Sequence, residues 1–288
     1  MSLDTPQALL DGLADALAPV GGVRAVVLGG SRGRGVHHAA SDHDIGLYYE
    51  GTLDLAALER VARALNDPGI ARGHEGDGVA ERPLMTAVGG WGPWVNGGGW
   101  LSVGGAPVDV LYRDLARVRD VIAEAQAGRF ECAYQYGHPH AFVSTIYAGE
   151  IATCRVLRDP DGAVAAAKAM LEPYPEALRA TTIARFADEA SFFLAIARKA
   201  AGKGDVTYVA GCAFRAASCL LQVVFALNRQ WLLNEKGALA LAGKFAVTPT
   251  DFRLNLEAAF AELASGPQGL LSALGAIGGL LEETAALA

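Results

Sequence analysis

Cysteine is scarce in this sequence, which has four such residues among 288. They are Cys132, Cys154, Cys212 and Cys219, and no two of them form a C-x-x-C pair. Small zinc-binding and disulfide-rich folds usually show cysteines that are paired or regularly spaced. We therefore expect free, buried thiols in a reducing cytoplasm rather than a zinc site.

The sequence also lacks a secretory signal, a long apolar run and an excess of basic charge. No basic segment followed by an apolar core opens the chain, and its longest apolar stretches are broken by charged residues or glycine. Lysine and arginine number 24 against 31 acidic residues, a net charge of −7. Proteins that bind long nucleic acids usually present a basic face. These absences predict a cytoplasmic protein with no membrane span and no long nucleic acid as its main partner.

The pattern of apolar residues changes along the chain. Short runs rich in β-branched residues predict strands at residues 23–28, 44–49 and 107–112. Helical spacing predicts helices at residues 3–17, 53–65 and 115–127, and then at 175–201, 206–233, 251–263 and 270–286. We predict an α+β fold: a mixed β-sheet flanked by helices over residues 1–128, followed by an α-helical bundle over residues 129–288.

A glycine-rich loop follows the first predicted strand. The strand ends in Gly29, Gly30 and Ser31, and ten residues then separate Ser31 from Asp42. Gly30 has no Cβ, so the backbone can bend sharply and a phosphate can approach closely. The Ser31 hydroxyl and nearby backbone N–H groups can bind the same anion. Arg32 and Arg34 either add charge-assisted contacts to it or are solvated loop charges.

Three aspartates follow this loop in positions that suit a hard cation. Asp42 and Asp44 are two residues apart at a predicted strand, so their side chains project from one face. Asp109 lies in the apolar run PVDVLY, where an ionised carboxyl is costly unless it is paired or bound to metal. If the two strands are neighbours, the carboxylates can hold two Mg²⁺ ions about 3.5–4 Å apart. The alternatives are a turn and strand cap for the first two, and a buried salt bridge to an arginine for Asp109.

The ordered set Gly30-Ser31, Asp42-His43-Asp44 and Asp109 resembles the nucleotidyltransferase superfamily related to DNA polymerase β. The resemblance covers about the first 115 residues. The helical second half is similar to the small-molecule branch, which includes the aminoglycoside and lincosamide nucleotidyltransferases, and residues 225–240 are similar to helical segments of that branch.

The resemblance implies transfer of a nucleoside monophosphate from an NTP to a hydroxyl of a small molecule, with release of pyrophosphate. It makes Asp42, Asp44 and Asp109 the catalytic residues that hold two Mg²⁺ ions. The nucleotide-binding residues that it implies are Gly29, Gly30, Ser31, Arg32 and Lys236. The base would be Asp109 itself, or Glu150 or Glu189 of the helical half. If the acceptor is an antibiotic, the activity would confer resistance.

Two other functions remain open. The same chemistry can act on a protein side chain or an RNA end, or the chain can be a non-catalytic, antitoxin-like binding protein. His138 and His140 flank a proline and are interpreted as part of a linker turn rather than as zinc ligands. The tryptophans of residues 89–105 either pack a glycine-rich hairpin or stack on a base or sugar. The apolar C-terminal helices form either a core or a homodimer interface.

Overall fold

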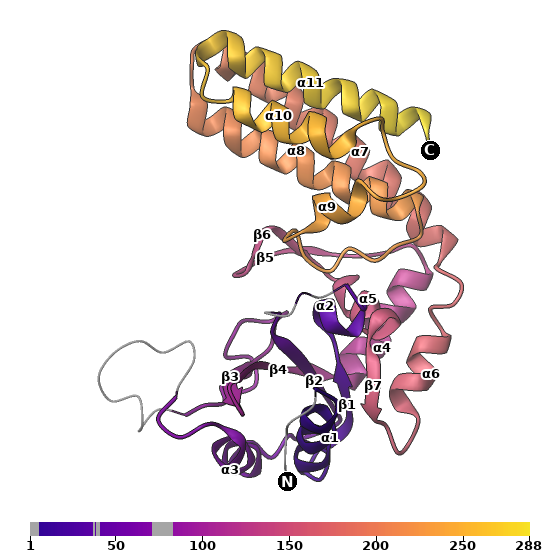
Figure 1. Ribbon diagram of the computed structural model, residues 1–288. Helices are drawn as coiled ribbons and strands as arrows, with labels where there is room; N and C mark the ends of the chain where they lie inside the picture. The colour runs from indigo at the N-terminus through magenta and orange to yellow at the C-terminus, as the bar shows by residue number, and fades with distance from the viewer. Residues whose placement is uncertain (1–5, 37, 39–40, 71–82) are drawn as a thin grey trace. The chain divides into compact units, whose positions relative to one another are not determined.

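A computed structural model of the chain describes residues 6–36, 38, 41–70 and 83–288 (Figure 1). It contains two compact units. The first unit consists of Met1–Ala123 and Tyr147–Pro173, and the second of Glu124–Ile146 and Tyr174–Ala288. The fold is mixed α+β, with a five-stranded mixed sheet flanked by helices and a C-terminal helical region.

The sheet of the first unit has the strand order β3-β4-β2-β1-β7. Its strands are β1 (Val23–Leu28), β2 (His43–Tyr49), β3 (Gly98–Val103), β4 (Ala106–Asp114) and β7 (Arg155–Arg158). The β2–β4 pair is parallel, and the other pairs are antiparallel. The strands predicted at residues 23–28, 44–49 and 107–112 are confirmed as β1, β2 and β4.

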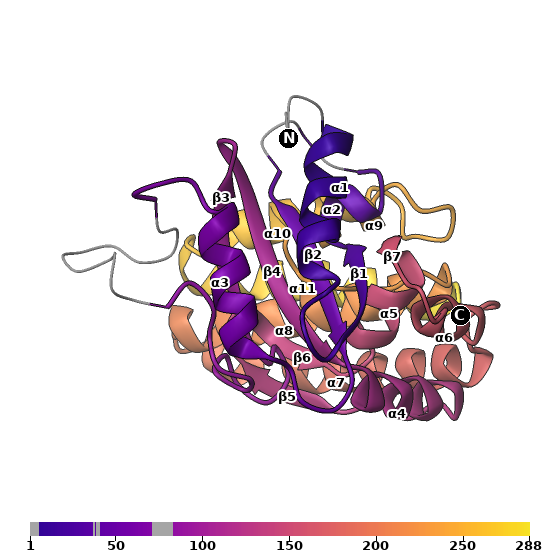
Figure 2. The ribbon, with the colours of Figure 1, turned by 90° about the horizontal axis from the view of Figure 1, so that it is seen from below.

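Two helices pack on one face of this sheet, α1 (Pro6–Leu17) and α3 (Leu55–Leu65) (Figure 2). The start of α3 is capped by Asp54, whose carboxylate accepts the Ala57 N–H at 2.9 Å. Alternate residues of β2, namely Ile45, Leu47 and Tyr49, are buried in the core formed with these helices. Since side chains alternate along a strand, the residues between them point to the opposite face.

The sequence predicted one boundary between the two units, at residues 128/129, whereas the chain passes between the units more than once. The chain enters the second unit as a hairpin of β5 (Cys132–Gln135) and β6 (His138–Val143). It then returns to the first unit through α5 (Ile146–Thr153), β7 and α6 (Ala163–Ala169). The physical reason is the pairing of β7 with β1, which completes the edge of the sheet. The segment predicted as a linker turn is thus a hairpin.

The second unit is built from long helices that run alongside one another (Figure 1). They are α7 (Glu176–Ala201), α8 (Val206–Leu227), α10 (Phe252–Glu262) and α11 (Gly266–Ala286), with the short α9 (Ala238–Ala242). Helix α8 ends earlier than predicted because Asn228 caps it, with its side-chain amide donating to Val224 O at 2.8 Å. Helix α4 (Leu115–Gln126) leads into this unit.

Helix α8 is long and apolar enough, by length and composition, to cross a membrane. Most of that apolar stretch, 72 %, is buried inside the protein. A buried central helix of a bundle has the same composition, because it is covered on nearly all sides.

The core of the second unit provides a stability test on α7. Phe186 is fully buried and stacks on Phe130, with ring centroids 5.5 Å apart, whereas Phe192 on the same helix is 60 % exposed. We expect Phe186→Ala to lower the free energy of unfolding by about 3–5 kcal/mol, since it leaves a cavity. The control Phe192→Ala should stay within about 0.5 kcal/mol of wild type. Urea unfolding followed by circular dichroism measures both, and equal losses would contradict the assigned core.

Candidate functional site

Asp44 and Asp109 lie directly opposite each other on neighbouring parallel strands. In the β2–β4 register their Cα atoms are partners, so both side chains project from the same face of the sheet. That face is the one opposite α1 and α3. Asp42 precedes β2 and acts electrostatically on the Asp44 carboxyl, as Asp109 does. The structure thus brings together the three predicted aspartates, all half-buried, and we call them the Asp cluster.

The Asp44 carboxyl has a strongly perturbed pKa. The pKa rises from 3.8 to about 6, mainly through burial and then through the negative charges of Asp109, Asp42 and Glu150, while Arg34 opposes the shift. Hard oxygen donors that repel one another fit a divalent cation such as Mg²⁺, which relieves the repulsion. Among the described residues, the carboxylate oxygens of the Asp cluster do not all lie within 4.8 Å of one another. The side chains must therefore rotate before all three can bind the same ion.

The glycine-rich loop touches the Asp cluster at Gly30. The residues after β1 form a short helix, α2 (Gly30–Gly33), rather than the open loop expected from the sequence. Gly29 donates its N–H to Asp44 O at 2.8 Å. Gly30 has a φ of +57°, and a Cβ at this position would lie 1.8 Å from Asp44 Oδ2. Glycine is required here both by the backbone conformation and by the close approach of the carboxyl.

The two arginines of the loop have different surroundings. Arg32 was predicted to bind nucleotide; in the structure its guanidinium donates to Ser41 O at 2.8 and 3.0 Å and to Asp42 O at 3.2 Å. It therefore holds the chain immediately before β2 against the loop. Arg34 acts electrostatically on Asp44, and its Nε is buried without a hydrogen-bond partner. Burial lowers the pKa of Arg34, and Asp44 opposes that shift.

Glu150, one of the candidate bases, is engaged in a two-pronged ion pair with Arg113. The distances are 2.6 Å from Nε to Oε2 and 2.7 Å from Nη2 to Oε1. Arg113 is buried at the end of β4 and also donates to the carbonyl oxygens of Val95 and Tyr112. This pair ties α5 to β4 next to the Asp cluster. Both carboxylate oxygens of Glu150 accept hydrogen bonds from Arg113, and no local sequence pattern indicates this pair because the two residues are 37 positions apart.

Two predicted site residues belong to the second unit, whereas the Asp cluster belongs to the first. Lys236 is exposed, and its backbone N–H donates to Asn234 Oδ1 at 2.8 Å. Glu189 forms an ion pair with Arg215, 3.0 Å from Nη2 to Oε1.

The tryptophans of residues 89–105 pack against other aromatic rings of the first unit. Trp91 and Trp100 stack with centroids 4.5 Å apart, and Trp94 meets the Tyr147 ring edge-on at 5.8 Å. A Cβ at Gly98 would lie 2.7 Å from the Trp91 ring, so the hairpin needs glycine for this packing. These contacts favour the packing interpretation of the tryptophans over stacking on a ligand.

The raised pKa of Asp44 predicts a pH-dependent gain in stability for Asp44→Asn in metal-free protein. The folded state holds the Asp44 proton up to about pH 6, whereas the unfolded chain loses it near 3.8, so ionisation at neutral pH costs stability. We expect the variant to be more stable at pH 7 by on the order of 1–3 kcal/mol. The gain should shrink as the pH falls from 6 towards 4. Chemical unfolding in chelator at several pH values tests this, and a pH-independent difference would contradict it.

The contact between Gly30 and Asp44 predicts unequal effects of two similar substitutions. Gly30 and Gly35 both have positive φ values, +57° and +71°, but a Cβ at Gly35 would meet nothing within 4 Å. Gly35→Ala should cost about 1 kcal/mol through backbone strain alone. Gly30→Ala should lower the free energy of unfolding by about 1–3 kcal/mol more than Gly35→Ala, because its Cβ overpacks against the Asp44 carboxyl. In an Asp44→Ala background this excess should vanish in thermal unfolding; an unchanged excess would refute the contact.

The chain is similar to one protein family and to solved structures. The model of a family described as a domain of unknown function (DUF4037) matches residues 145–236. No curated protein matches the chain. Among solved structures, the chain is similar to a nucleotidyltransferase-like protein from Exiguobacterium sibiricum, with 12 % identity and a TM-score of 0.40 over 93 % of this chain and 71 % of that chain.

Proposed function

We propose that the protein is a Mg²⁺-dependent nucleotidyltransferase that moves a nucleoside monophosphate from an NTP to a hydroxyl of a small molecule and releases pyrophosphate. One observation carries the proposal: Asp44 and Asp109 are register partners on adjacent strands, with Gly30 of the Gly-Ser loop packed against the Asp44 carboxyl. A polyphosphate-binding turn beside paired carboxylates is the arrangement that metal-assisted phosphoryl transfer requires.

The roles of the residues follow from their positions. Asp42, Asp44 and Asp109 would hold the Mg²⁺ ions, which when bound neutralise the triphosphate and lower the pKa of the acceptor hydroxyl. Backbone N–H groups at Gly30 and Ser31 would bind phosphate oxygens, since N–H groups at the start of a helical turn are unpaired.

Arg34 supplies a positive charge beside the carboxylates. Its buried Nε has no hydrogen-bond partner, which suits a donor to a phosphate oxygen. Arg32 would act on the nucleotide indirectly, because its guanidinium holds the backbone of Ser41 and Asp42. A direct contact of Lys236 with the triphosphate remains part of the proposal.

Asp109 is the proposed acceptor of the proton from the attacking hydroxyl. Glu150 is held by Arg113 through two hydrogen bonds, and Glu189 by Arg215, so both are ion-paired. Glu150 instead acts on the site electrostatically, because its negative charge raises the pKa of Asp44.

The net charge of −7 suits a cationic small-molecule acceptor, for example an aminoglycoside-like compound, in a cytoplasmic protein. Transfer to a protein side chain or an RNA end is the second candidate acceptor class. A non-catalytic binding role is the third alternative, and the close grouping of three carboxylates with a glycine turn speaks against it, because such grouping is costly without a cation.

The test measures pyrophosphate release from each NTP with Mg²⁺ and a panel of aminoglycosides, lincosamides and hydroxylated metabolites. Asp109→Asn should lower turnover at least about 100-fold, the scale expected when an electrostatic stabiliser of the reacting group is lost. Asp120→Asn, which removes the same charge from an exposed position on α4, should leave turnover unchanged.

Nucleotide binding provides a readout that needs no acceptor. Calorimetry should show NTP binding that depends on Mg²⁺ in wild type and in Asp120→Asn but is weakened in Asp109→Asn. Label transfer from an α-labelled NTP in a cell extract separates metabolites from RNA and protein as acceptors. Absence of Mg²⁺-dependent NTP binding in wild type would refute the proposal and favour the binding role.

A further inference from the structure

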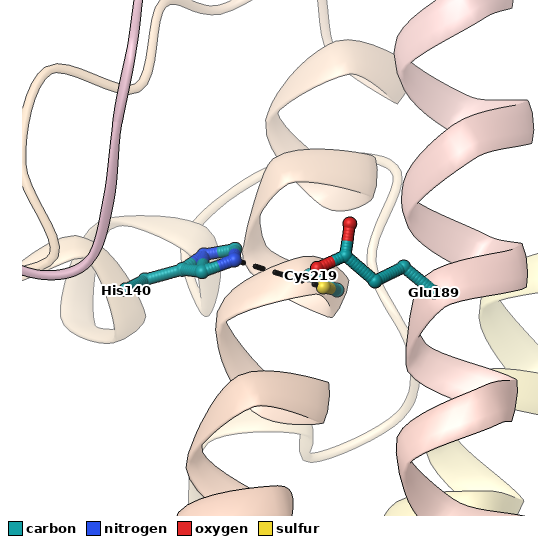
Figure 3. A group of neighbouring side chains, drawn as sticks. All are labelled: His140, Glu189 and Cys219. Carbon is teal, nitrogen blue, oxygen red and sulfur yellow. Dashed lines mark hydrogen bonds between the residues drawn. The ribbon is translucent and has the colours of Figure 1, made fainter. Parts of the chain in front are cut away.

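A second cluster of metal-ligating side chains lies inside the second unit. His140 on β6, Glu189 on α7 and Cys219 on α8 place one ligand atom each within 4.8 Å of one another (Figure 3). His140 and Cys219 are buried, and Glu189 is half-buried. We call this group the His-Glu-Cys cluster. All of its members belong to the second compact unit, whereas the Asp cluster belongs to the first.

The orientation of the imidazole distinguishes a metal site from a catalytic triad. His140 Nε2 lies 3.9 Å from Cys219 Sγ, and Figure 3 shows the same edge of the ring facing Glu189. In a nucleophilic triad the thiol and the carboxylate form hydrogen bonds to different nitrogens of the imidazole ring, so that the carboxylate orients the ring from the side away from the thiol. Here thiol, carboxylate and one ring nitrogen converge on a common point, which is the geometry of ligands around an ion.

The backbone of His140 is held firmly in place. Its N–H donates to Glu235 Oε1 at 2.8 Å, and its carbonyl oxygen accepts from Arg215 Nη1 at 2.6 Å. The ring also meets Phe186 edge-on, with centroids 6.0 Å apart. Anchoring of this kind fixes a ligand before metal binds.

Arg215 also orients the carboxylate of the cluster. Its Nη2 donates to Glu189 Oε1 at 3.0 Å. A carboxylate has two oxygens and about four acceptor sites, so this contact is compatible with coordination of an ion. Metal ligands are commonly held by such outer groups. Glu235, which accepts the His140 N–H, also acts electrostatically on His140.

We propose that the His-Glu-Cys cluster is a Zn²⁺ site. Thiolate, imidazole and carboxylate are the ligands of protein-bound zinc, and a thiolate ligand disfavours Mg²⁺. Three protein ligands leave a fourth position on a tetrahedral ion for water. Binding forms a Zn–S bond and breaks the S–H bond of Cys219, so one proton is released to solvent for each ion bound. The thiolate and carboxylate then neutralise the charge of the ion.

The sequence did not indicate this site because its ligands come from three separate elements. His140 and Cys219 are 79 residues apart, so no short spacing motif exists. The prediction that the cysteines form no zinc site rested on the absence of C-x-x-C pairs. All four cysteines are free thiols, so Cys219 is available in its reduced form.

The test uses the full chain, freed of metal with a chelator and kept reduced, in excess Mg²⁺ so that the Asp cluster does not compete. Competition with a chromophoric zinc indicator measures stoichiometry and affinity, and Co²⁺ replaces Zn²⁺ as a spectroscopic probe. We expect one high-affinity Zn²⁺ per chain, and a near-ultraviolet thiolate-to-cobalt band with the visible bands of tetrahedral Co²⁺. Cys219→Ser should abolish the thiolate band and weaken Zn²⁺ binding at least about 100-fold, the upper end of what loss of an outer-shell partner alone costs.

Cys212→Ser is the matched control. Cys212 is a buried thiol on the same helix, seven residues before Cys219, and is not a member of the cluster. It should keep wild-type affinity and the thiolate band. Circular dichroism of metal-free variants separates loss of a ligand from loss of fold, and His140→Gln provides a second ligand deletion. Zn²⁺ binding equally tight in Cys219→Ser and wild type, or no thiolate band in folded wild type, would overturn the proposal.

Discussion

Electrostatic repulsion between Asp44 and Asp109 is the constraint on which the first unit depends. The parallel β2–β4 register places the two carboxyls side by side on one face of the sheet, and burial strengthens their interaction. The neighbouring structure accommodates the Asp44 carboxyl in specific ways: Gly30 leaves room for its oxygen, and Arg34 supplies a compensating charge. A sheet selected for stability alone would place apolar residues here, so the cost indicates that the position serves binding or chemistry.

Local sequence patterns predicted the elements but not their pairing. The strands VRAVVL and PVDVLY are apparent from their β-branched residues, and the acidic residues and glycines of the site were identified from their order along the chain. Which strands pair, and in which register, depends on contacts between distant residues. The opposition of Asp44 and Asp109 could only be inferred, because the two are 65 positions apart.

The contacts that were missed share the same cause. Arg113 and Glu150 are 37 residues apart and meet only because α5 returns to the first unit after the hairpin. The His-Glu-Cys cluster likewise depends on the packing of β6 against α8. In each case an ionisable or ligating side chain looked ordinary in its own segment. Arg113 is buried at the end of an apolar strand. A buried charge is costly unless it is paired, so this position required an acidic partner such as Glu150.

The edge position of β7 has a consequence for how the first unit forms. The sheet remains incomplete until residues 155–158 have been synthesised, long after β1, and the hairpin β5–β6 lies between them in the chain. Until then the outer edge of β1 presents unpaired N–H and C=O groups to solvent, and such edges recruit strands from other molecules. A fragment cut at residue 128 would retain that bare edge permanently, so aggregation is the expected fate of an isolated N-terminal half. Nascent chains would be exposed to the same hazard for the time needed to translate the intervening segment.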